Sequence, residues 1–298
     1  LCEASVTHNG ASCDVTFEPP GAMCDDGDPE TEGDVCDGTG GCSGEAPYDV
    51  LVYAHFQDQE LGTYSKDMII EDFQNAAPWA NGLDEGRATV AEEDGERFLR
   101  VSYPEGGVGS ALGGCQFKVP LGDAYEELYV SYWVRFGQGL DFVKGGKMPG
   151  LCGGDCNTGG NVPDGTDGFS ARLMWRPDGK VTQYMYMPDQ VSQWGDSLYW
   201  DEGGQKVFVP GEWHQVQTRL VMNTPGVHDG VLQSWFDGQL ALDRDDIRYR
   251  DTTDLQLDTL YFSTFFGGSG EDWAPTADEV VDFDELVIST GPISFDAP

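Results

Sequence analysis

The sequence predicts an all-β protein built as a two-sheet β-sandwich (jelly roll) with a small disulfide-rich segment at its N-terminus. Three observations lead to this prediction. The 298 residues include 41 glycines, 12% of the residues are aromatic, and long helical periods are scarce. Several short segments alternate between apolar and polar residues and are separated by turn residues. The length suits one large β domain with a small appendage.

Residues 1–46 differ in composition from residues 47–298, so we expect a separate cysteine-rich, acidic module followed by the sandwich domain. The module holds eleven acidic residues, no lysine or arginine, and few large apolar side chains. Such a segment cannot build a core alone, and disulfides are expected to hold it together. Its five cysteines are Cys2, Cys13, Cys24, Cys36 and Cys42. Because five is odd, we expect Cys115 to pair with one of them, whereas Cys152 and Cys156 are close enough to pair with each other.

The same module contains a loop rich in carboxylates. Calcium takes roughly six to eight oxygen ligands, and Asp25, Asp26, Asp28 and Asp34 could supply several of them. The spacing is not that of an EF-hand, so a solvated acidic loop is the favoured interpretation and a structural Ca²⁺ site the alternative. Eight cysteines indicate an oxidising compartment, and Leu1 is interpreted as the mature start of a secreted protein.

The second region reads as a series of strands connected by short turns, which suits a jelly roll. Strands are expected over residues 50–56, 97–103, 128–136, 169–176, 180–187, 260–266 and 280–289, with others near 213–216 and 234–239, and residues 68–73 are expected to begin or cross the sandwich. In residues 128–136, Arg135 shares a face with Tyr129, Ser131 and Trp133 and is assigned with equal weight to substrate binding or to a structural ion pair. Trp194, in the polar loop of residues 189–205, is a candidate for stacking on a sugar ring.

The central feature is a predicted hairpin in which residues 169–176 and 180–187 are joined by Pro177-Asp178-Gly179. A three-residue loop that ends in glycine is a common hairpin connection, and it fixes the register. If Arg176 lies opposite Lys180, the cross-strand pairs are Met174–Thr182, Arg172–Tyr184 and Ser170–Tyr186. Side chains alternate across a strand, so these residues lie on one face while a mostly apolar set covers the other.

Basic residues gather around this hairpin. Six of the sixteen basic residues lie between positions 135 and 180, namely Arg135, Lys144, Lys147, Arg172, Arg176 and Lys180. Five acidic residues share that window, so its net charge is +1 in a chain of net charge −37. Lys144 and Lys147 stand in a glycine-rich loop that would bring mobile positive charge beside the hairpin. A locally basic groove on an acidic body indicates an anionic ligand.

The segments FVKGGKMPGL, GFSARLMWR, QYMYMP, NTPGVHDGVLQSWFDG and FSTFFGG together resemble polysaccharide lyase family 14, which contains alginate lyases and glucuronan lyases. The resemblance extends over roughly residues 49–293. It implies a β-jelly roll with catalytic residues on its concave face. The lysine of the family's GGK segment falls on Lys147, its serine and arginine on Ser170 and Arg172, and its tyrosine pair on Tyr184 and Tyr186.

A lyase of this kind would cleave a polyuronate by β-elimination, in which the C5 proton leaves and the bond from C4 to the bridging oxygen breaks. Arg172 can bind the uronate carboxylate through two parallel hydrogen bonds, and Ser170 can add another. Tyr184 and Tyr186 are the expected base and acid, in an order that the sequence leaves open, because Arg172 and Lys147 would favour a phenolate. Lys147, Lys144, Arg135 and Arg176 are assigned to substrate binding or charge tuning, with Lys147 as the base if neither phenol serves. No cofactor is required.

Other function classes fit less well. No basic stripe is large enough for nucleic acid, and no apolar run is long enough to span a membrane. A glycoside hydrolase of similar shape would need a carboxylate pair on one strand face, and the acidic run of residues 278–285 lacks that spacing. A carbohydrate-binding β-sandwich without turnover remains an alternative, as does glucuronan rather than alginate as the substrate. We expect a secreted monomer that acts on an anionic polysaccharide.

Overall fold

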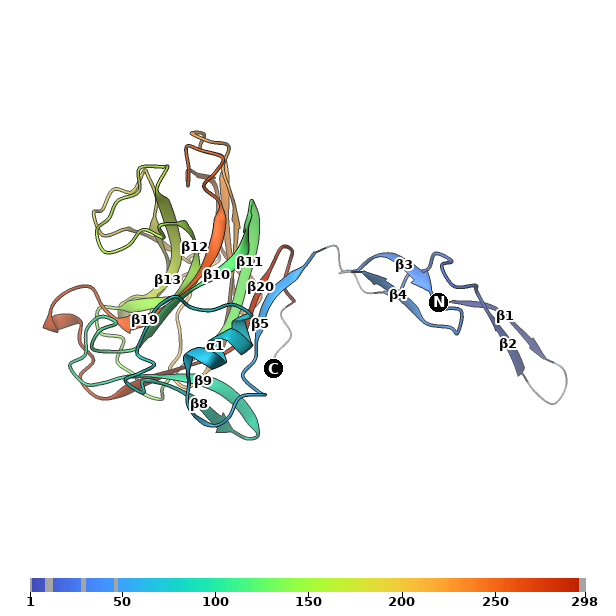
Figure 1. Cartoon of the computed structure of the whole chain (residues 1–298), viewed down its shortest axis with the longest axis horizontal. Helices are drawn as coiled ribbons and strands as arrows, with labels where there is room; N and C mark the ends of the chain where they lie inside the picture. The colour runs from blue at the N-terminus through green and yellow to red at the C-terminus, as the bar shows by residue number, and fades with distance from the viewer. Residues whose placement is uncertain (1, 9–12, 28–30, 46–47, 295–298) are drawn as a thin grey trace. The chain divides into compact units, whose positions relative to one another are not determined.

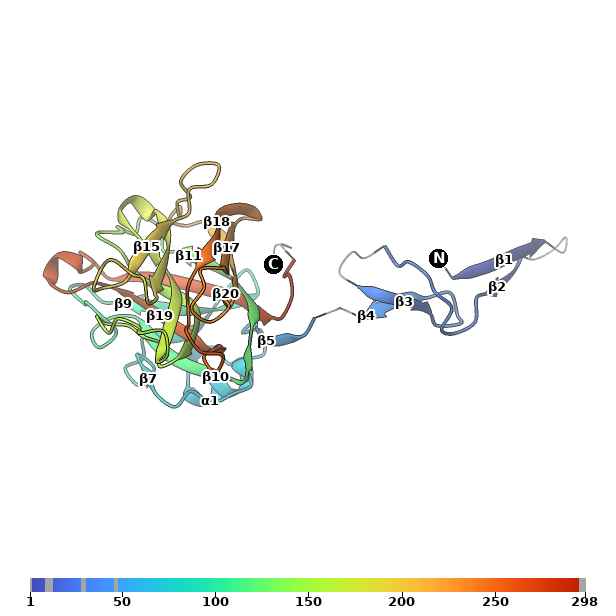
Figure 2. The same cartoon turned by 90° about the horizontal axis from the view of Figure 1, so that it is seen from above.

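The computed structural model describes residues 2–8, 13–27, 31–45 and 48–294. The chain divides into two compact units, Leu1–Asp49 and Val50–Pro298. The larger unit is a sandwich of two antiparallel sheets (Figures 1 and 2), which confirms the predicted fold class. No helix within the described ranges is long and apolar enough to cross a membrane.

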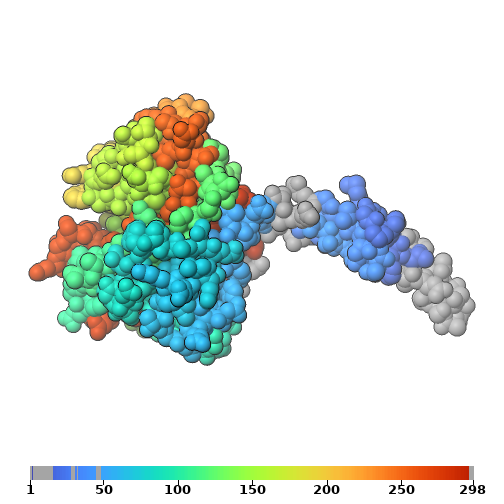
Figure 3. Space-filling view, viewed as in Figure 1, coloured from blue at the N-terminus to red at the C-terminus, as the bar shows by residue number. Residues whose placement is uncertain are grey.

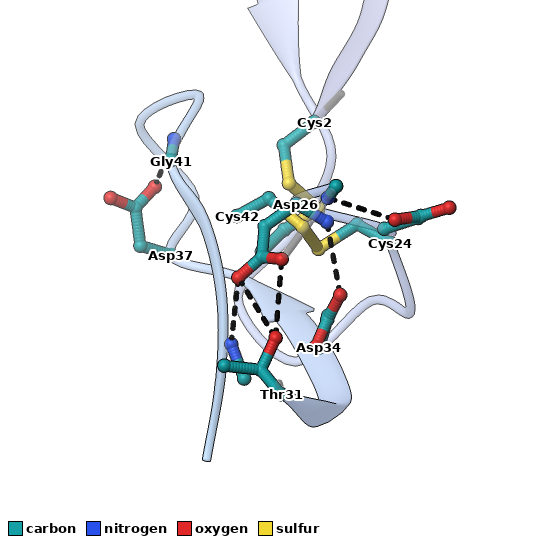
Figure 4. Close-up of a disulfide and its surroundings, with 12 residues drawn as sticks. Cys2, Cys24, Asp26, Thr31, Asp34, Asp37, Gly41 and Cys42 are labelled. Atoms are coloured by element: carbon teal, nitrogen blue, oxygen red, sulfur yellow. Dashed lines mark hydrogen bonds between the residues drawn. A yellow bond between two sulfur atoms is a disulfide. The ribbon is translucent and has the colours of Figure 1, made fainter. Parts of the chain in front are cut away.

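The small unit consists of two short antiparallel hairpins. β1 (Glu3–His8) pairs with β2 (Cys13–Phe17), and β3 (Glu32–Cys36) pairs with β4 (Cys42–Glu45). Disulfides join Cys2 to Cys36 and Cys24 to Cys42 (Figure 4). The segment is therefore held by covalent links, as its shortage of large apolar side chains predicts.

The first sheet of the large unit has seven strands in the order β15-β14-β13-β12-β19-β10-β7. Their bounds are β7 Ala80–Asn81, β10 Cys115–Tyr125, β12 Gly146–Gly154, β13 Gly168–Trp175, β14 Val181–Tyr186, β15 Asp196–Tyr199 and β19 Leu257–Phe266. Two one-turn 3₁₀ segments, Pro177–Gly179 and Glu271–Trp273, lie in its connections. This sheet carries the predicted hairpin in its β13–β14 pair.

The second sheet has nine strands in the order β18-β17-β16-β11-β20-β9-β8-β6, and β5 also pairs with β20. Their bounds are β5 Val50–Ala54, β6 Gly62–Thr63, β8 Ala88–Glu93, β9 Glu96–Tyr103, β11 Glu127–Phe136, β16 Trp213–Val221, β17 Gly230–Phe236, β18 Gln239–Ile247 and β20 Glu279–Ser289. Buried apolar side chains from both sheets form one continuous core, to which Trp175 and Phe262 of the first sheet and Val130 and Phe283 of the second contribute.

Residues 68–73 lie in the helix α1 (Lys66–Phe73). Ser65 caps this helix, because its hydroxyl accepts a hydrogen bond from the Met68 backbone N–H at 3.2 Å. Ile69 and Phe73 are four residues apart and both are buried, so one face of the helix packs against the core.

Candidate active site

The predicted hairpin register is confirmed. The Cα partners of β13 and β14 are Ser170–Tyr186, Arg172–Tyr184 and Met174–Thr182, and the Arg176 backbone N–H donates to the Lys180 carbonyl. Asp178 and Gly179 take the left-handed conformations that close the turn, at φ 64° and 73°. The odd-numbered residues of β13 enter the core, so the even-numbered residues lie on the opposite face of the sheet.

Lys147 reaches this face from a strand rather than from a mobile loop. The glycine-rich segment forms the start of β12, and every residue from Gly146 to Gly153 is buried. A Cβ atom at Gly146 would lie 2.1 Å from the Trp175 ring, and one at Gly150 would lie 2.2 Å from the Ala171 carbonyl oxygen. The glycines therefore permit close packing between β12 and β13, and the prediction of mobile positive charge is wrong for Lys147.

The Lys147 ammonium lies among groups that leave its charge uncompensated. The side chain is 8% exposed, its Nζ donates to the Met174 sulfur at 2.9 Å, and it lies 3.9 Å from the centroid of the Tyr184 ring. Burial lowers the pKa of Lys147 well below its usual range, and the charges of Arg172 and Arg176 lower it further. Lys147 therefore loses its proton at a lower pH than an exposed lysine does.

Arg172 is buried beside Lys147, and part of its hydrogen-bonding capacity is unused. Its Nη1 donates to the Ser263 hydroxyl at 3.0 Å, whereas its Nε has no acceptor among the described residues. Because the Nε atom is buried, a ligand carboxylate in the cleft would meet the guanidinium through its Nη groups. Ser170, which was expected to share that carboxylate, instead donates to the Asn157 carbonyl at 2.7 Å and is fully buried. Its predicted contact with substrate is therefore not supported, and Ser263 is the serine beside Arg172.

The two tyrosines of β14 lie side by side with ring centroids 5.7 Å apart. Burial raises the pKa of Tyr184, and the neighbouring Tyr186 raises it further, while Arg172 and Arg176 act in the opposite direction without prevailing. The expected lowering of this pKa by neighbouring cations is therefore wrong, and Tyr184 is held as a neutral phenol. The Tyr186 hydroxyl accepts a hydrogen bond from the Gly160 backbone N–H at 3.0 Å, so it anchors the loop that follows the Cys152–Cys156 bridge.

These groups open into a cleft of about 520 Å³. Lys147, Arg172, Arg176, Tyr184 and Tyr186 all line it, and Trp194 lines one wall while Trp273 and residues 267–269 line another. In Figure 3 the molecule is hollowed between the yellow-green surface around β13 and the red surface of the loop that follows β19. The structure therefore brings together four of the five predicted catalytic residues, with Arg176 and Trp194 from the predicted binding set.

The cleft gathers most of the basic groups that lack an acidic partner. Eleven of the sixteen basic side chains form ion pairs with aspartate or glutamate. Within the described part of the chain, the five without such a partner are Lys118, Lys147, Arg172, Arg176 and Lys206. Three of these line the cleft, and Lys118 lies 5.0 Å from the ring centroid of Tyr261, which also lines it. In a chain with 53 acidic residues, this concentration of unpaired cations indicates a site for a polyanion.

Two predicted substrate-binding residues lie elsewhere. Arg135 is on β11 of the second sheet, where it forms ion pairs with Asp282 at 2.9 Å and with Glu93 at 2.5 Å. Of the two roles considered for it, the structural ion pair is the one found, and the assignment to substrate binding is wrong. Lys144 pairs with Asp272 and lies 5.9 Å from the Trp273 ring centroid. It is not among the residues that line the cleft, but it contacts the loop whose Trp273 does.

The predicted disulfide between Cys152 and Cys156 is confirmed. The predicted partner role of Cys115 is wrong, because this cysteine is free and buried in the core. Burial raises the pKa of the Cys115 thiol to about 12, which keeps it protonated and unreactive.

The acidic loop of the small unit brings Asp25, Asp26 and Asp34 together, with one oxygen of each within 4.8 Å of the others. Asp28 lies outside the described residues. The Asp26 and Asp34 carboxylates accept hydrogen bonds from Thr31 and from backbone N–H groups (Figure 4). With one ligand oxygen from each carboxylate, the cluster offers three of the roughly six to eight oxygens that calcium takes, so a Ca²⁺ site here stays a prediction.

Sequence reasoning missed the contribution of β19 to the cleft. Tyr261 and Phe265 line it and Ser263 contacts Arg172. These positions alternate along the strand, which was predicted only as a largely apolar segment. Two polar residues spaced by two in such a segment were the available signal. The Trp273 loop gave no comparable signal, because its position depends on long-range contacts.

Comparison with known proteins agrees with this geometry. The family model of polysaccharide lyase 14 matches residues 91–286. This chain is 26% identical to a variant of the alginate lyase Aly36B, with a TM-score of 0.70 over 83% of this chain and 98% of that one. That variant has one lysine and one tyrosine replaced by alanine and was solved in complex with an alginate tetrasaccharide. The marine PL-14 alginate lyase from Aplysia kurodai is 27% identical, with a TM-score of 0.65 over 78% of this chain and 98% of that one. The fold is shared with alginate lyase vAL-1 from Chlorella virus. That protein is 22% identical to this chain, with a TM-score of 0.64 over 78% of this chain and 99% of that one. No curated protein matches the chain.

Proposed function

Because this chain belongs to polysaccharide lyase family 14 and is therefore a polysaccharide lyase, we propose that it cleaves alginate by β-elimination to give an unsaturated uronate product. The observation that carries the proposal is the cluster of unpaired cations beside two buried phenols in one cleft. Alginate is favoured because the relatives that share about a quarter of their sequence with this chain are alginate lyases. Three disulfides fit a secreted protein.

In this mechanism Arg172 binds the carboxylate of the sugar whose C5 proton is removed. That proton is poorly acidic because the adjacent carboxylate is already negative, and removing it places further charge on the carboxylate oxygens. The Nη groups of Arg172 stabilise that charge most when it is largest, in the transition state. Ser263 fixes the guanidinium from behind.

Lys147 is the proposed base. Its lowered pKa makes the amine available to accept the C5 proton, and no acidic residue in the described ranges forms an ion pair with it. Tyr184 is the proposed acid, because its raised pKa keeps the phenol protonated until the bridging O4 oxygen leaves and takes the proton. Lys147 Nζ lies 3.9 Å from the Tyr184 ring centroid, so the proposed base and the proposed acid are neighbours in the cleft. This arrangement reverses the sequence-based preference for a tyrosine base.

The test is to incubate the protein separately with polymannuronate, polyguluronate and glucuronan and to follow the ultraviolet absorbance of the unsaturated product. We expect the absorbance to grow with at least one of the two alginate blocks. An absorbance increase with glucuronan alone would mean that glucuronan, and not alginate, is the substrate. No absorbance increase with any of the three polymers would overturn the proposal.

A further inference from the structure

Lys118 is an unpaired cation that lies beside the cleft and has no role in the proposed mechanism. It is on β10, where its Cα is paired with that of Tyr261 on β19. Its Nζ donates to the Asp155 backbone carbonyl at 3.0 Å and forms no ion pair with any acid that the structure describes. Of the two nearby carboxylates, that of Asp258 accepts hydrogen bonds from the Gly154 N–H and from Thr259. The charges of both carboxylates raise the pKa of Lys118, although neither forms an ion pair with it.

Tyr261 connects Lys118 to the catalytic groups. The Arg172 guanidinium carbon lies 4.7 Å from the centroid of the Tyr261 ring, and Lys118 Nζ lies 5.0 Å from the same point. The Tyr261 hydroxyl donates to Gln116 at 3.3 Å, and both residues line the cleft. Gln116 and Lys118 are two apart on β10, so they share a face. A continuous surface therefore leads from Arg172 across Tyr261 to Gln116 and Lys118.

The environment of Lys118 favours an anionic ligand over a structural role. Burial lowers the pKa of Lys118 and the charge of Arg172 lowers it further, while the charges of Asp155 and Asp258 offset this effect only in part. A carboxylate of a ligand placed near Lys118 would complete the compensation of a charge that Asp155 and Asp258 compensate only in part. The Tyr261 side chain is buried and contacts both cations, so it sets the spacing between the two charges.

We propose that Lys118, together with Tyr261 and Gln116, forms a second carboxylate-binding subsite, which receives a uronate unit on one side of the unit held by Arg172. The proposal rests on the proposed function, because only a polymer with a carboxylate on each sugar would present charges to both cations. It also fixes the path of the polymer, which crosses the strands of the seven-stranded sheet in the order β13, β12, β19, β10.

The experiment compares Lys118→Gln with wild type for alginate oligosaccharides of increasing length. Wild-type KM should fall when the oligosaccharide becomes long enough to reach Lys118, and Lys118→Gln should lose that gain, with KM about tenfold higher for long substrates and unchanged for the shortest. Lys118→Arg keeps the charge and should stay within about threefold of wild type. Lys206→Gln is the matched control, because it removes the same charge from a lysine that contacts Gln239, the first residue of β18 in the other sheet.

Equal shifts in Lys118→Gln and Lys206→Gln would overturn the subsite, as would a loss in Lys118→Gln that is the same at every length. Melting temperatures of both variants equal to that of wild type establish that folding is intact. Dissociation constants for the same oligosaccharides, measured by calorimetry in a Lys147→Ala background, separate this proposal from the proposed function. If wild type cleaves no polyuronate but the length-dependent binding is lost in Lys118→Gln, the subsite stands and the lyase assignment fails.

Discussion

Replacing Lys147 by arginine tests the assignment of the base most directly. Lys147 is buried, its charge is uncompensated, and its pKa lies well below 10.5 because of burial and the charges of Arg172 and Arg176. Arginine keeps the charge and much of the length, but it stays protonated at any usable pH and cannot accept a proton. General base catalysis contributes about 10²- to 10⁴-fold. We therefore expect kcat/KM of Lys147→Arg to fall by that factor, equivalent to about 3–5 kcal/mol of transition-state stabilisation.

The assay is the initial rate of ultraviolet absorbance growth on alginate between about pH 5 and pH 10. Below the pKa of Lys147 the ammonium form cannot accept the C5 proton, so wild-type kcat/KM should rise about tenfold per pH unit and then level off. The plateau should extend to alkaline pH, because the raised pKa of Tyr184 keeps the acid protonated. Lys147→Ala and Lys147→Arg should both lose the rising limb.

Lys180→Arg is the control, since Lys180 lies at the exposed hairpin turn and pairs with Asp178. It should keep the wild-type profile. The reasoning is refuted if Lys147→Arg retains more than about a tenth of wild-type activity, or if its rising limb persists. In that case one of the phenols must be the base.

Three further predictions concern the same cleft. Arg172→Lys replaces a two-point donor by a single ammonium, so kcat/KM should drop at least about 100-fold; a loss below tenfold on the same alginate would show that another group neutralises the carboxylate. Tyr184→Phe should lower kcat about 10²- to 10³-fold with little change in melting temperature, as measured by single-substrate kinetics and calorimetry, and full activity would exclude it as the acid. The net charge of −37 repels a polyanion, and salt screens this repulsion. KM for the polymer should therefore fall as ionic strength rises from about 0.01 to 0.1 M, because the Debye length shrinks from about 30 to 10 Å. A KM that does not change with salt would contradict this.

The β13–β14 hairpin was predictable to the residue because its register depends only on local information. A three-residue turn sets which residues face each other, and the period of two sets which share a face. Both rules apply within twenty residues of sequence, and no distant contact overrides them. The pairing of Arg172 with Tyr184 therefore followed from the sequence alone, as did the all-β class.

The errors arose where position along the chain does not determine position in space. Arg135 has the alternation expected of a groove residue, but its strand lies in the other sheet, and only the sheet order reveals this. Ser170 is on the correct face, yet the Asn157 carbonyl takes its hydroxyl. The glycines before Lys147 suggested flexibility, whereas the Trp175 ring packs directly against Gly146. The pKa directions of the site depend on burial, which a sequence does not display.

The uncompensated cations of the cleft have a consequence for how the protein responds to heat. Like charges held close together in a desolvated site oppose folding, so any anion that binds beside Arg172 and Arg176 relieves that repulsion in the native state alone. Binding to the native state raises the melting temperature in proportion to the logarithm of ligand concentration above Kd. A melting-point screen of acidic sugars with the Lys147→Ala variant, which retains the two guanidinium groups, can therefore rank candidate polymers before any bond is cut.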